Sequence, residues 1–240
     1  MRNASTETRI FWLSLNYFFW HIVIIFLSKE IQDKLLLADV LDILTPFFMI
    51  FMGAWLWLAL DESPVQSKAR YSRLGALFLF TAGAVAFVEG HGMHLSANAV
   101  ARHLTQIPET SVYRLTYFFD EILGHILWDS GWVLMCVGIA WRAVGLAPQQ
   151  TGSRRMVYVA AFFFGFTYSC NAIEGQTVIF MLPAALISAT TLIVMRWRAT
   201  KKQNPVLAFF MYGCLVACFL FAFWYFLQGS FVEFSKAGWV

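Results

Sequence analysis

Seven long apolar stretches constrain this chain of 240 residues more than any other feature of its sequence. A bilayer's hydrocarbon core is about 30 Å thick, and roughly 20 helical residues cross it. Only closed hydrogen-bonded structures such as helices satisfy the backbone there. The sequence therefore predicts an all-α, seven-helix membrane bundle, with spans at residues 10–27, 36–60, 74–97, 115–141, 156–172, 177–194 and 206–227.

The fifth and sixth spans are separated by a short polar break. No Lys or Arg occurs between Arg155 and Arg196, and the polar segment 171–176 lies near the middle of that interval, where it predicts a tight turn. The first apolar stretch is not followed by a small-residue cleavage site, so we interpret it as a membrane helix and not as a removable signal. No soluble domain or linker is visible, and residues 1–240 are interpreted as a single membrane domain.

The composition agrees with a protein that lies mostly in lipid. Hydrophobic residues make up 60% of the chain and charged residues only 13%, whereas soluble domains carry about 25% charged residues. A net charge of +3 is too small to indicate a nucleic-acid partner. The four cysteines lie in apolar stretches without a CxxC pair, which predicts buried thiols and no disulfide framework.

Lys and Arg distribution predicts the orientation, because cytoplasmic loops of membrane proteins are enriched in these residues. Twelve basic residues fall on the side of the N-terminus and five on the other side. We therefore expect a cytoplasmic N-terminus and an external C-terminus, in a bacterial or archaeal plasma membrane. The twelve are Arg2, Arg9, Lys68, Arg70, Arg73, Arg142, Arg154, Arg155, Arg196, Arg198, Lys201 and Lys202.

Polar residues gather at the external ends of the predicted spans. Among them, Asp39 and Asp42 are expected to be the solvated start of the second span, and Glu174 a turn residue at the water boundary. His21 is expected to be a hydrogen-bonded interfacial histidine, and His103 a solvated residue of the external loop, which also contains Arg102. The aromatic segment after the seventh span is interpreted either as a cover over the mouth of the bundle or as an interfacial anchor.

The third span ends in an HxxH pattern. At about 100° per residue, His91, His94 and Asn98 fall within an arc of about 60° on one face of the helix. The third and fourth spans are joined by a predicted loop of roughly 16–20 residues, and they are expected to be antiparallel neighbours, because short connections between helices favour that arrangement.

The fourth span carries four ionisable groups, which is costly in a bilayer. Glu121 and His125 share a stripe with Trp128, with Asp129 beside it and Asp120 on another edge. If the third and fourth spans are neighbours, this stripe could face the one that carries His91, His94 and Asn98. Each ionisable group in a membrane helix costs about 2.5–3.5 kcal/mol on insertion scales, so these groups are expected to be paired, hydrated or bound to a cation. This is the strongest functional signal in the chain.

These residues predict a metal-dependent enzyme with its site in the external half of the bundle. Three protein ligands plus a water are typical of catalytic zinc, and iron or copper also bind such donors. The substrate is expected to be a lipid or another apolar molecule, and the reaction a hydrolysis. The candidate ligands are His91, His94 and His125 with Glu121 or Asp120, and the candidate catalytic residues are Asp129, as a base, and Asn98.

Other readings use the same residues. They could form a structural hydrogen-bond network, a proton or divalent-cation transporter, or a non-catalytic metal-binding subunit of a larger membrane complex. Permeation needs a polar path to the cytoplasmic side, and the inner halves of the third to fifth spans are strongly apolar, which disfavours transport. Axial haem ligation by two of the histidines is disfavoured by the surrounding carboxylates.

Seven spans with His and Asp residues near one membrane face resemble the CREST superfamily of membrane hydrolases, which includes the alkaline ceramidases. The resemblance implies a zinc-dependent amide or ester hydrolase acting on a lipid. It covers the number of spans and not a motif: members typically carry an HxxxH pair on the last span, and the seventh span here has no histidine.

Overall fold

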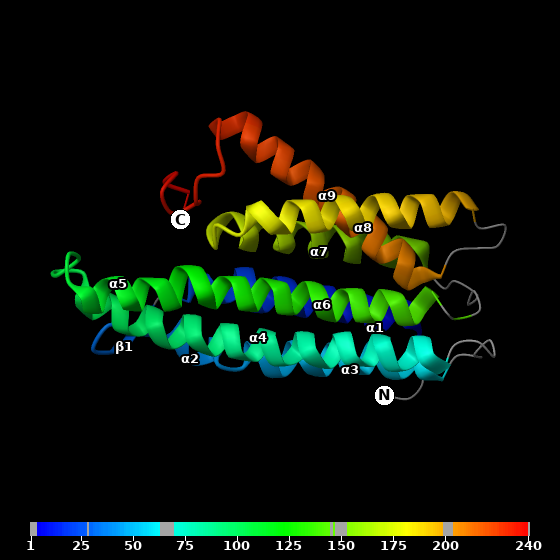
Figure 1. Cartoon of the computed structure of the whole chain (residues 1–240), viewed down its shortest axis with the longest axis horizontal. Helices are drawn as coiled ribbons and strands as arrows, with labels where there is room; N and C mark the ends of the chain where they lie inside the picture. Colours follow the sequence, from blue (N-terminus) through cyan, green and yellow to red (C-terminus); the bar gives the residue numbers. More distant parts are fainter. Residues whose placement is uncertain are drawn as a thin grey trace.

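The structure is a computed structural model that describes residues 4–27, 29–62, 70–144, 146, 153–198 and 204–239. In this part of the chain, seven helical segments are long and apolar enough to cross a membrane, which confirms the predicted all-α architecture. Figure 1 shows them running back and forth along one axis, with the two termini at opposite ends of the bundle. Arg2, Lys68, Lys201 and Lys202 lie outside the described residues.

Several spans are composed of more than one helical element. The first combines α1 (Thr6–Phe18) with the π-helix η1 (Phe19–Val23) and the 3-10 helix η2 (Ile24–Phe26), and the second combines α2 (Leu37–Asp42) with α3 (Thr45–Asp61). The fourth combines α5 (Ser111–Tyr117), the π-helix η3 (Phe118–Gly124) and α6 (His125–Val144). The remaining elements are α4 (Arg70–Leu104), α7 (Arg154–Glu174), α8 (Val178–Arg198) and α9 (Pro205–Gln228).

Local capping chemistry explains where several of these helices begin and end. The side chain of Ser5 accepts a hydrogen bond from the backbone N–H of Thr8 at the start of α1, and Thr110 caps α5 in the same way. The helix α9 begins at Pro205, where a missing N–H costs no hydrogen bond, and ends at Gln228, just before Gly229, which adopts a left-handed conformation.

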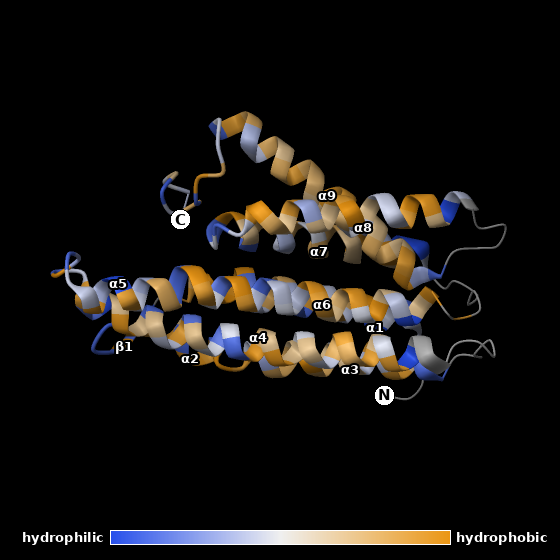
Figure 2. Cartoon of the chain, viewed as in Figure 1, coloured by the Kyte–Doolittle hydropathy of each residue, from blue (hydrophilic) through white to orange (hydrophobic). Residues whose placement is uncertain are grey.

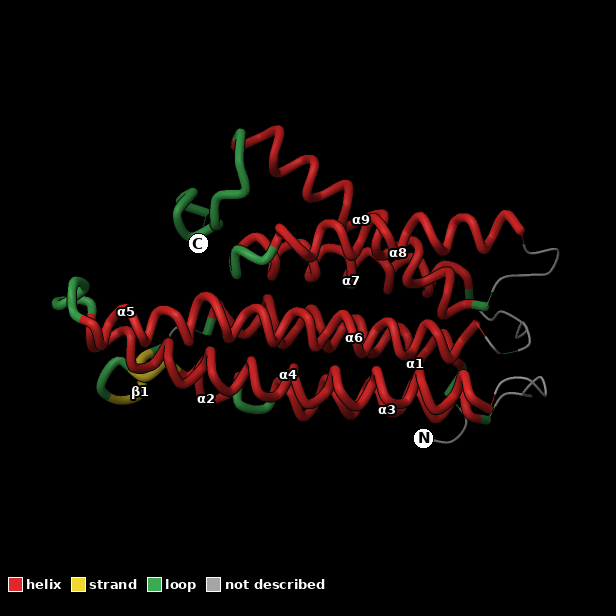
Figure 3. Tube along the Cα trace, viewed as in Figure 1, coloured by secondary structure: helices red, strands yellow, loops and turns green. Residues whose placement is uncertain are grey.

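A two-stranded hairpin separates the first two spans. Strands β1 (Glu30–Gln32) and β2 (Leu35–Leu36) pair antiparallel through a turn in which Asp33 and Lys34 have positive φ. In the described part of the chain these are the only strands, and Figure 3 shows them at one end of the bundle.

The connection between the third and fourth spans is much shorter than the predicted 16–20 residues. Because α4 continues to Leu104 and α5 begins at Ser111, only residues 105–110 join them. The added helical turns contain Arg102 and His103, so the prediction that they lie in a loop is wrong, although His103 is exposed as expected.

The helices α4 and α6 pack against each other along their length (Figure 1), which confirms that the third and fourth spans are neighbours. The contact depends on small residues, because a methyl group added to Gly90 would lie 2.2 Å from the backbone nitrogen of Trp128. Glycine allows such an approach between membrane helices. This packing brings the polar ends of α4 and α6 together.

The outer surface of the bundle is strongly apolar. Large side chains such as Phe78 and Ile179, which are 71% and 86% exposed, point away from the core. Figure 2 shows the most hydrophilic segments toward the two ends of the bundle. This distribution is typical of a surface that faces lipid over its middle and water at its ends.

At the end that holds the N-terminus, charged groups are paired. Arg142 is 3% exposed, and its Nε lies 3.1 Å from a carboxylate oxygen of Asp61, while Arg73 contacts the other oxygen at 2.7 Å. Asp61 is thus shared between helices α4 and α6, which it joins to α3.

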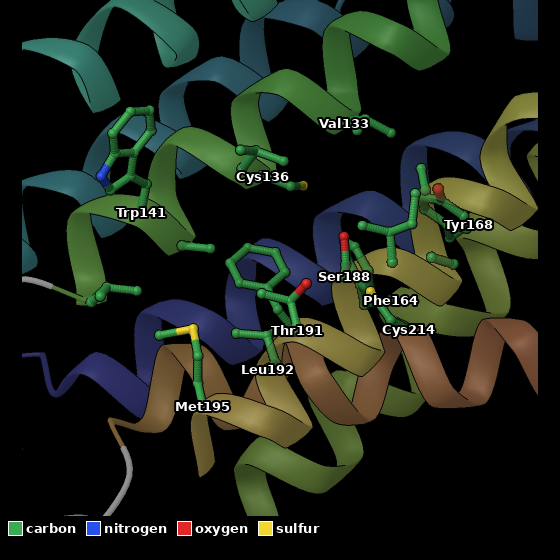
Figure 4. A pocket seen from close by; sticks show the side chains of 17 residues that line it. Val133, Cys136, Trp141, Phe164, Tyr168, Ser188, Thr191, Leu192, Met195 and Cys214 are labelled. Atoms are coloured by element: carbon green, nitrogen blue, oxygen red, sulfur yellow. The ribbon is translucent and has the colours of Figure 1, made fainter. Parts of the chain in front are cut away.

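An apolar cavity of about 350 Å³ lies between α6 and α8 in this half of the bundle. Figure 4 shows it bordered by Val133 and Trp141 of α6, Leu192 and Met195 of α8, and Phe164 of α7. Its lining offers few polar atoms, among them the hydroxyl groups of residues 188 and 191.

Candidate functional site

A cavity of about 360 Å³ opens toward the other end of the bundle, where residues of the hairpin and of the segment after α9 line it. It receives side chains from five of the seven spans and from the segment after α9. The lining residues are Trp20, His21, Ile24, Ile25, Leu36, Ala38, Asp39, Asp42, His94, Asn98, Arg102, Glu121, His125, Trp128, Asp129, Asn171, Glu174, Gly175, Glu233 and Ser235.

Two of the candidate metal ligands meet across the α4–α6 contact. The rings of His94 and His125 have centroids 4.4 Å apart, as expected for two facing stripes. His94 Nδ1 lies 2.7 Å from a carboxylate oxygen of Asp120. The two atoms are not aligned as a hydrogen bond, but a carboxylate this close favours a proton on Nδ1, which in the neutral ring leaves the lone pair on Nε2.

The carboxylate of Glu121 completes this wall of the cavity. One of its oxygens lies 3.9 Å from Nε2 of His125, one helical turn away. The other edge of the His125 ring faces the turn after α7, where a methyl group added to Gly175 would lie 2.5 Å from Nδ1. The turn between the fifth and sixth spans therefore needs glycine to accommodate the imidazole.

Asp120 does not line the cavity. It is buried behind His94, and its contact with Nδ1 makes it a group that orients the imidazole. Of the two roles considered for Asp120, completing a ligand shell or orienting a histidine, this geometry favours the second.

His91 contacts the second span and does not line the cavity. It is 1% exposed, it is not among the residues that line the cavity, and its Nε2 lies 2.9 Å from the backbone carbonyl oxygen of Asp42. The structure therefore gives His91 a contact with α2 and does not bring it to the same wall as His94 and His125.

Both candidate catalytic residues line the cavity. Asp129 lies one turn after His125, and its carboxylate accepts a short hydrogen bond from the hydroxyl group of Thr177. Asn98 lies one turn after His94 on α4. A buried carboxylate with a single fixed donor can still act on a group that enters the cavity, because its second oxygen remains available.

Asp39 is not a solvated interfacial residue as predicted. Arg102 donates two hydrogen bonds to the Asp39 carboxylate, from Nη1 at 2.5 Å and from Nη2 at 2.7 Å, and the Asp39 side chain is buried. The prediction failed because the sequence pattern ended α4 before Arg102. This bidentate pair is a strong interaction that fixes α2 against α4.

His21 lines the cavity from the end of the first span. Its Nδ1 donates to the backbone carbonyl of Tyr17 at 3.0 Å, as expected for a hydrogen-bonded histidine. Its Nε2 is buried and has no hydrogen-bond partner among the described residues. A carbonyl only accepts, so in the neutral ring Nε2 is a free acceptor.

The C-terminal segment covers one side of the cavity. The backbone N–H of Phe234 donates to the carboxylate of Glu174 at 2.8 Å, and the indole of Trp224 donates to the carbonyl of Val232 at 2.9 Å. Glu233 then lines the cavity. The contact between its carboxylate and Lys236 raises the pKa of the Lys236 ammonium. Of the two readings of this segment, the geometry favours the cover.

Two π-helical segments carry residues of the site. His21 lies in η1, and Asp120 and Glu121 lie in η3. Such segments are rare and occur frequently at functional sites. No pattern in the sequence with a period of 3.6 residues predicts them.

No group of three or more His, Cys, Asp and Glu side chains within the described ranges is arranged to hold a metal ion. Comparisons with protein-family models, with curated proteins and with solved structures find no match to this chain. The site is therefore interpreted from its own chemistry.

Proposed function

We propose that this protein is a metal-dependent membrane enzyme, a hydrolase that acts on a lipid or another apolar molecule in the cavity described above. The observation that carries the proposal is the meeting of His94, His125 and Glu121 at one wall, with Asp120 behind His94. Two imidazoles and a carboxylate from two packed helices are a donor set that suits a divalent transition metal, zinc first.

His94, His125 and Glu121 would hold the metal, and Asp120 would keep His94 in the tautomer that presents Nε2. A bound zinc ion supplies a water whose pKa is lowered toward about 7 and polarises a carbonyl group. The donors are close together but are not in a complete coordination geometry, so the proposal requires side-chain adjustment on metal binding.

The chain's own residues supply the remaining functions. Asp129 is the candidate base, held in one orientation by the hydroxyl group of Thr177. Asn98 offers both a donor and an acceptor for a polar group of the substrate. The apolar wall formed by Trp20 and Ile24 suits the hydrocarbon part of a lipid.

The proposed orientation has a cytoplasmic N-terminus and an external C-terminus, based on the excess of Lys and Arg on the N-terminal side. In a bacterial or archaeal plasma membrane this places the cavity in the outer half of the bilayer. Reporter fusions test it: a reporter active only outside the cytoplasm should work at the C-terminus, and a cytoplasmic reporter there should stay silent.

The decisive experiment for the metal is a measurement of bound metal by mass spectrometry on the purified protein. We expect about one equivalent of a transition metal, lost in His94→Ala and in His125→Ala. His103→Ala is the matched control, because His103 is an exposed histidine on α4 outside the cavity. Equal metal content in all four proteins, or none in any after reconstitution, would refute the ligand assignment.

Transport is the alternative that uses the same cavity. A conduit would have to pass the level of Phe87, Trp132 and Phe164, which are buried in the apolar core. This arrangement favours a closed site over a path for ions. Metal-dependent flux into proteoliposomes would reverse that preference, and stoichiometric copurification of other membrane proteins would instead favour an accessory subunit.

A further inference from the structure

The cavity that holds the candidate site is rich in negative charge. Among the described residues, six Asp and Glu side chains line the cavity. Arg102 is the one Lys or Arg residue that lines it with them. That guanidinium is engaged by Asp39, and Lys236 contacts Glu233. The four other carboxylates, which have no Lys or Arg partner in the described structure, are those of Asp42, Glu121, Asp129 and Glu174.

Four carboxylates in a partly enclosed site favour a cation, because burial makes their ionisation costly unless a positive charge enters beside them. Low-dielectric walls focus the field of such a cluster on whatever enters. With all four ionised, a divalent metal ion would offset two of the negative charges and leave two (four minus two), so an attraction for a second cation would remain. An anionic head group would be repelled with or without the metal.

His21 adds a requirement that charge alone does not impose. It is 5% exposed, it lines the cavity, and its Nε2 has no partner among the described residues. Because Nδ1 donates to Tyr17, Nε2 can only accept a hydrogen bond in the neutral ring. Leaving a buried acceptor unsatisfied costs about 1–3 kcal/mol. Because Nε2 itself has almost no accessible surface, a ligand N–H group would reach it after a small shift of the ring and would then remove that cost.

The wall beside His21 is apolar. Trp20, Ile24 and Ile25 come from the end of the first span, and Leu36 comes from the hairpin. Ile25 is exposed on the outer surface, so this wall continues toward the side of the bundle that faces lipid. The ligand therefore meets acceptors on one side and hydrocarbon on the other.

We propose that the cavity binds an amphiphile whose head group is a cation bearing N–H donors, a protonated long-chain amine. His21 Nε2 accepts one N–H, the carboxylates attract the charge, and the apolar wall contacts the chain. This inference rests on the proposed function, because it names the class of substrate or product that the same site would bind.

The test compares three probes of equal chain length on the purified full-length protein in a non-ionic detergent: dodecylamine, dodecyltrimethylammonium and dodecanoate. Binding is followed by tryptophan fluorescence, since Trp20 and Trp128 line the cavity. We expect the amine to bind roughly tenfold or more tightly than the trimethylammonium probe, which has charge but no N–H, because a hydrogen bond to a charged group is worth that much. Dodecanoate should not compete.

Two variants locate the effect. His21→Phe should reduce the preference for the amine over the trimethylammonium probe to about one, and His21→Gln, which restores an acceptor, should recover part of it. His103→Phe is the matched control and should behave as the unmodified protein. Equal affinity for the two cations in the unmodified protein, a preference unchanged in His21→Phe, or tighter binding of dodecanoate would each overturn the proposal.

The measurement is made on chelator-treated protein and needs no turnover. A protein that binds no metal but prefers the amine would refute the metal-dependent function and leave the binding class standing. A protein that binds metal through His94 and His125 but shows no preference for the amine would support the metal site and refute the proposed binding of a long-chain amine.

Discussion

Replacing Gly90 by alanine tests whether α4 and α6 are packed as tightly as the site requires. The added methyl group would lie 2.2 Å from the backbone nitrogen of Trp128 and 2.6 Å from the carbonyl oxygen of Gly124. Both are backbone atoms, so a side-chain rotation cannot relieve the contact. Reaching an ordinary separation of about 3.4 Å means that the two helices part by roughly 1.2 Å.

Overpacking of this kind costs about 1–3 kcal/mol. At about 2–4 °C per kcal/mol for a chain of this size, Gly90→Ala should lower the midpoint of thermal unfolding by roughly 2–12 °C. The same displacement would move His94 away from His125, so bound metal should fall as well.

The same helix provides a matched control. A methyl group added to Gly92 meets nothing within 4 Å, and alanine is favoured over glycine in a helix by about 0.5–1 kcal/mol. Gly92→Ala should therefore unfold at the same or a slightly higher temperature. Thermal unfolding of both variants in one detergent, followed by circular dichroism, checks this. If Gly90→Ala is as stable as Gly92→Ala, the close packing inferred for the two helices is refuted.

Three further predictions concern other contacts. Arg142→Ala removes the buried partner of the Asp61 carboxylate, which keeps its contact with Arg73, and should cost about 1–3 kcal/mol in unfolding free energy, measured by denaturant titration; a loss below about 0.5 kcal/mol would contradict the pairing. Gly175→Ala should displace the ring of His125 and weaken metal binding by tenfold or more, measured by competition with a chelator, while unchanged affinity would place the ring elsewhere. Trp224→Phe removes the hydrogen bond that holds the C-terminal segment and should speed its removal by a protease, with the unmodified protein as the reference.

The sequence was informative about the site wherever one helix carried the information. The stripe of Glu121, His125 and Trp128 follows from the helix period, and all three line the cavity. The pattern also allowed this stripe to face the third span, and the close His94 and His125 rings show that it does. Periodicity within a helix determines which side chains share a face, because that relation is local.

The same reasoning could not separate the roles of His91 and His94. Both lie on one face of α4, yet one contacts α2 and the other lines the cavity. The difference arises because α4 packs against both α2 and α6. Where each of these helices lies along α4 depends on tertiary packing and not on the sequence of α4. Arg102 was assigned to a loop for a related reason, since the hydrophobic pattern ends before the helix does.

By itself, the sequence determined the seven spans, their order and the end at which ionisable groups gather, because apolar length and polar placement are properties of the chain alone. Only the tertiary structure decided that Asp120 contacts His94, that Arg102 pairs with Asp39, and that the segment after α9 hydrogen-bonds to Glu174. These contacts join residues distant in sequence, and their geometry depends on how closely neighbouring helices approach, which the glycines of α4 and α6 permit.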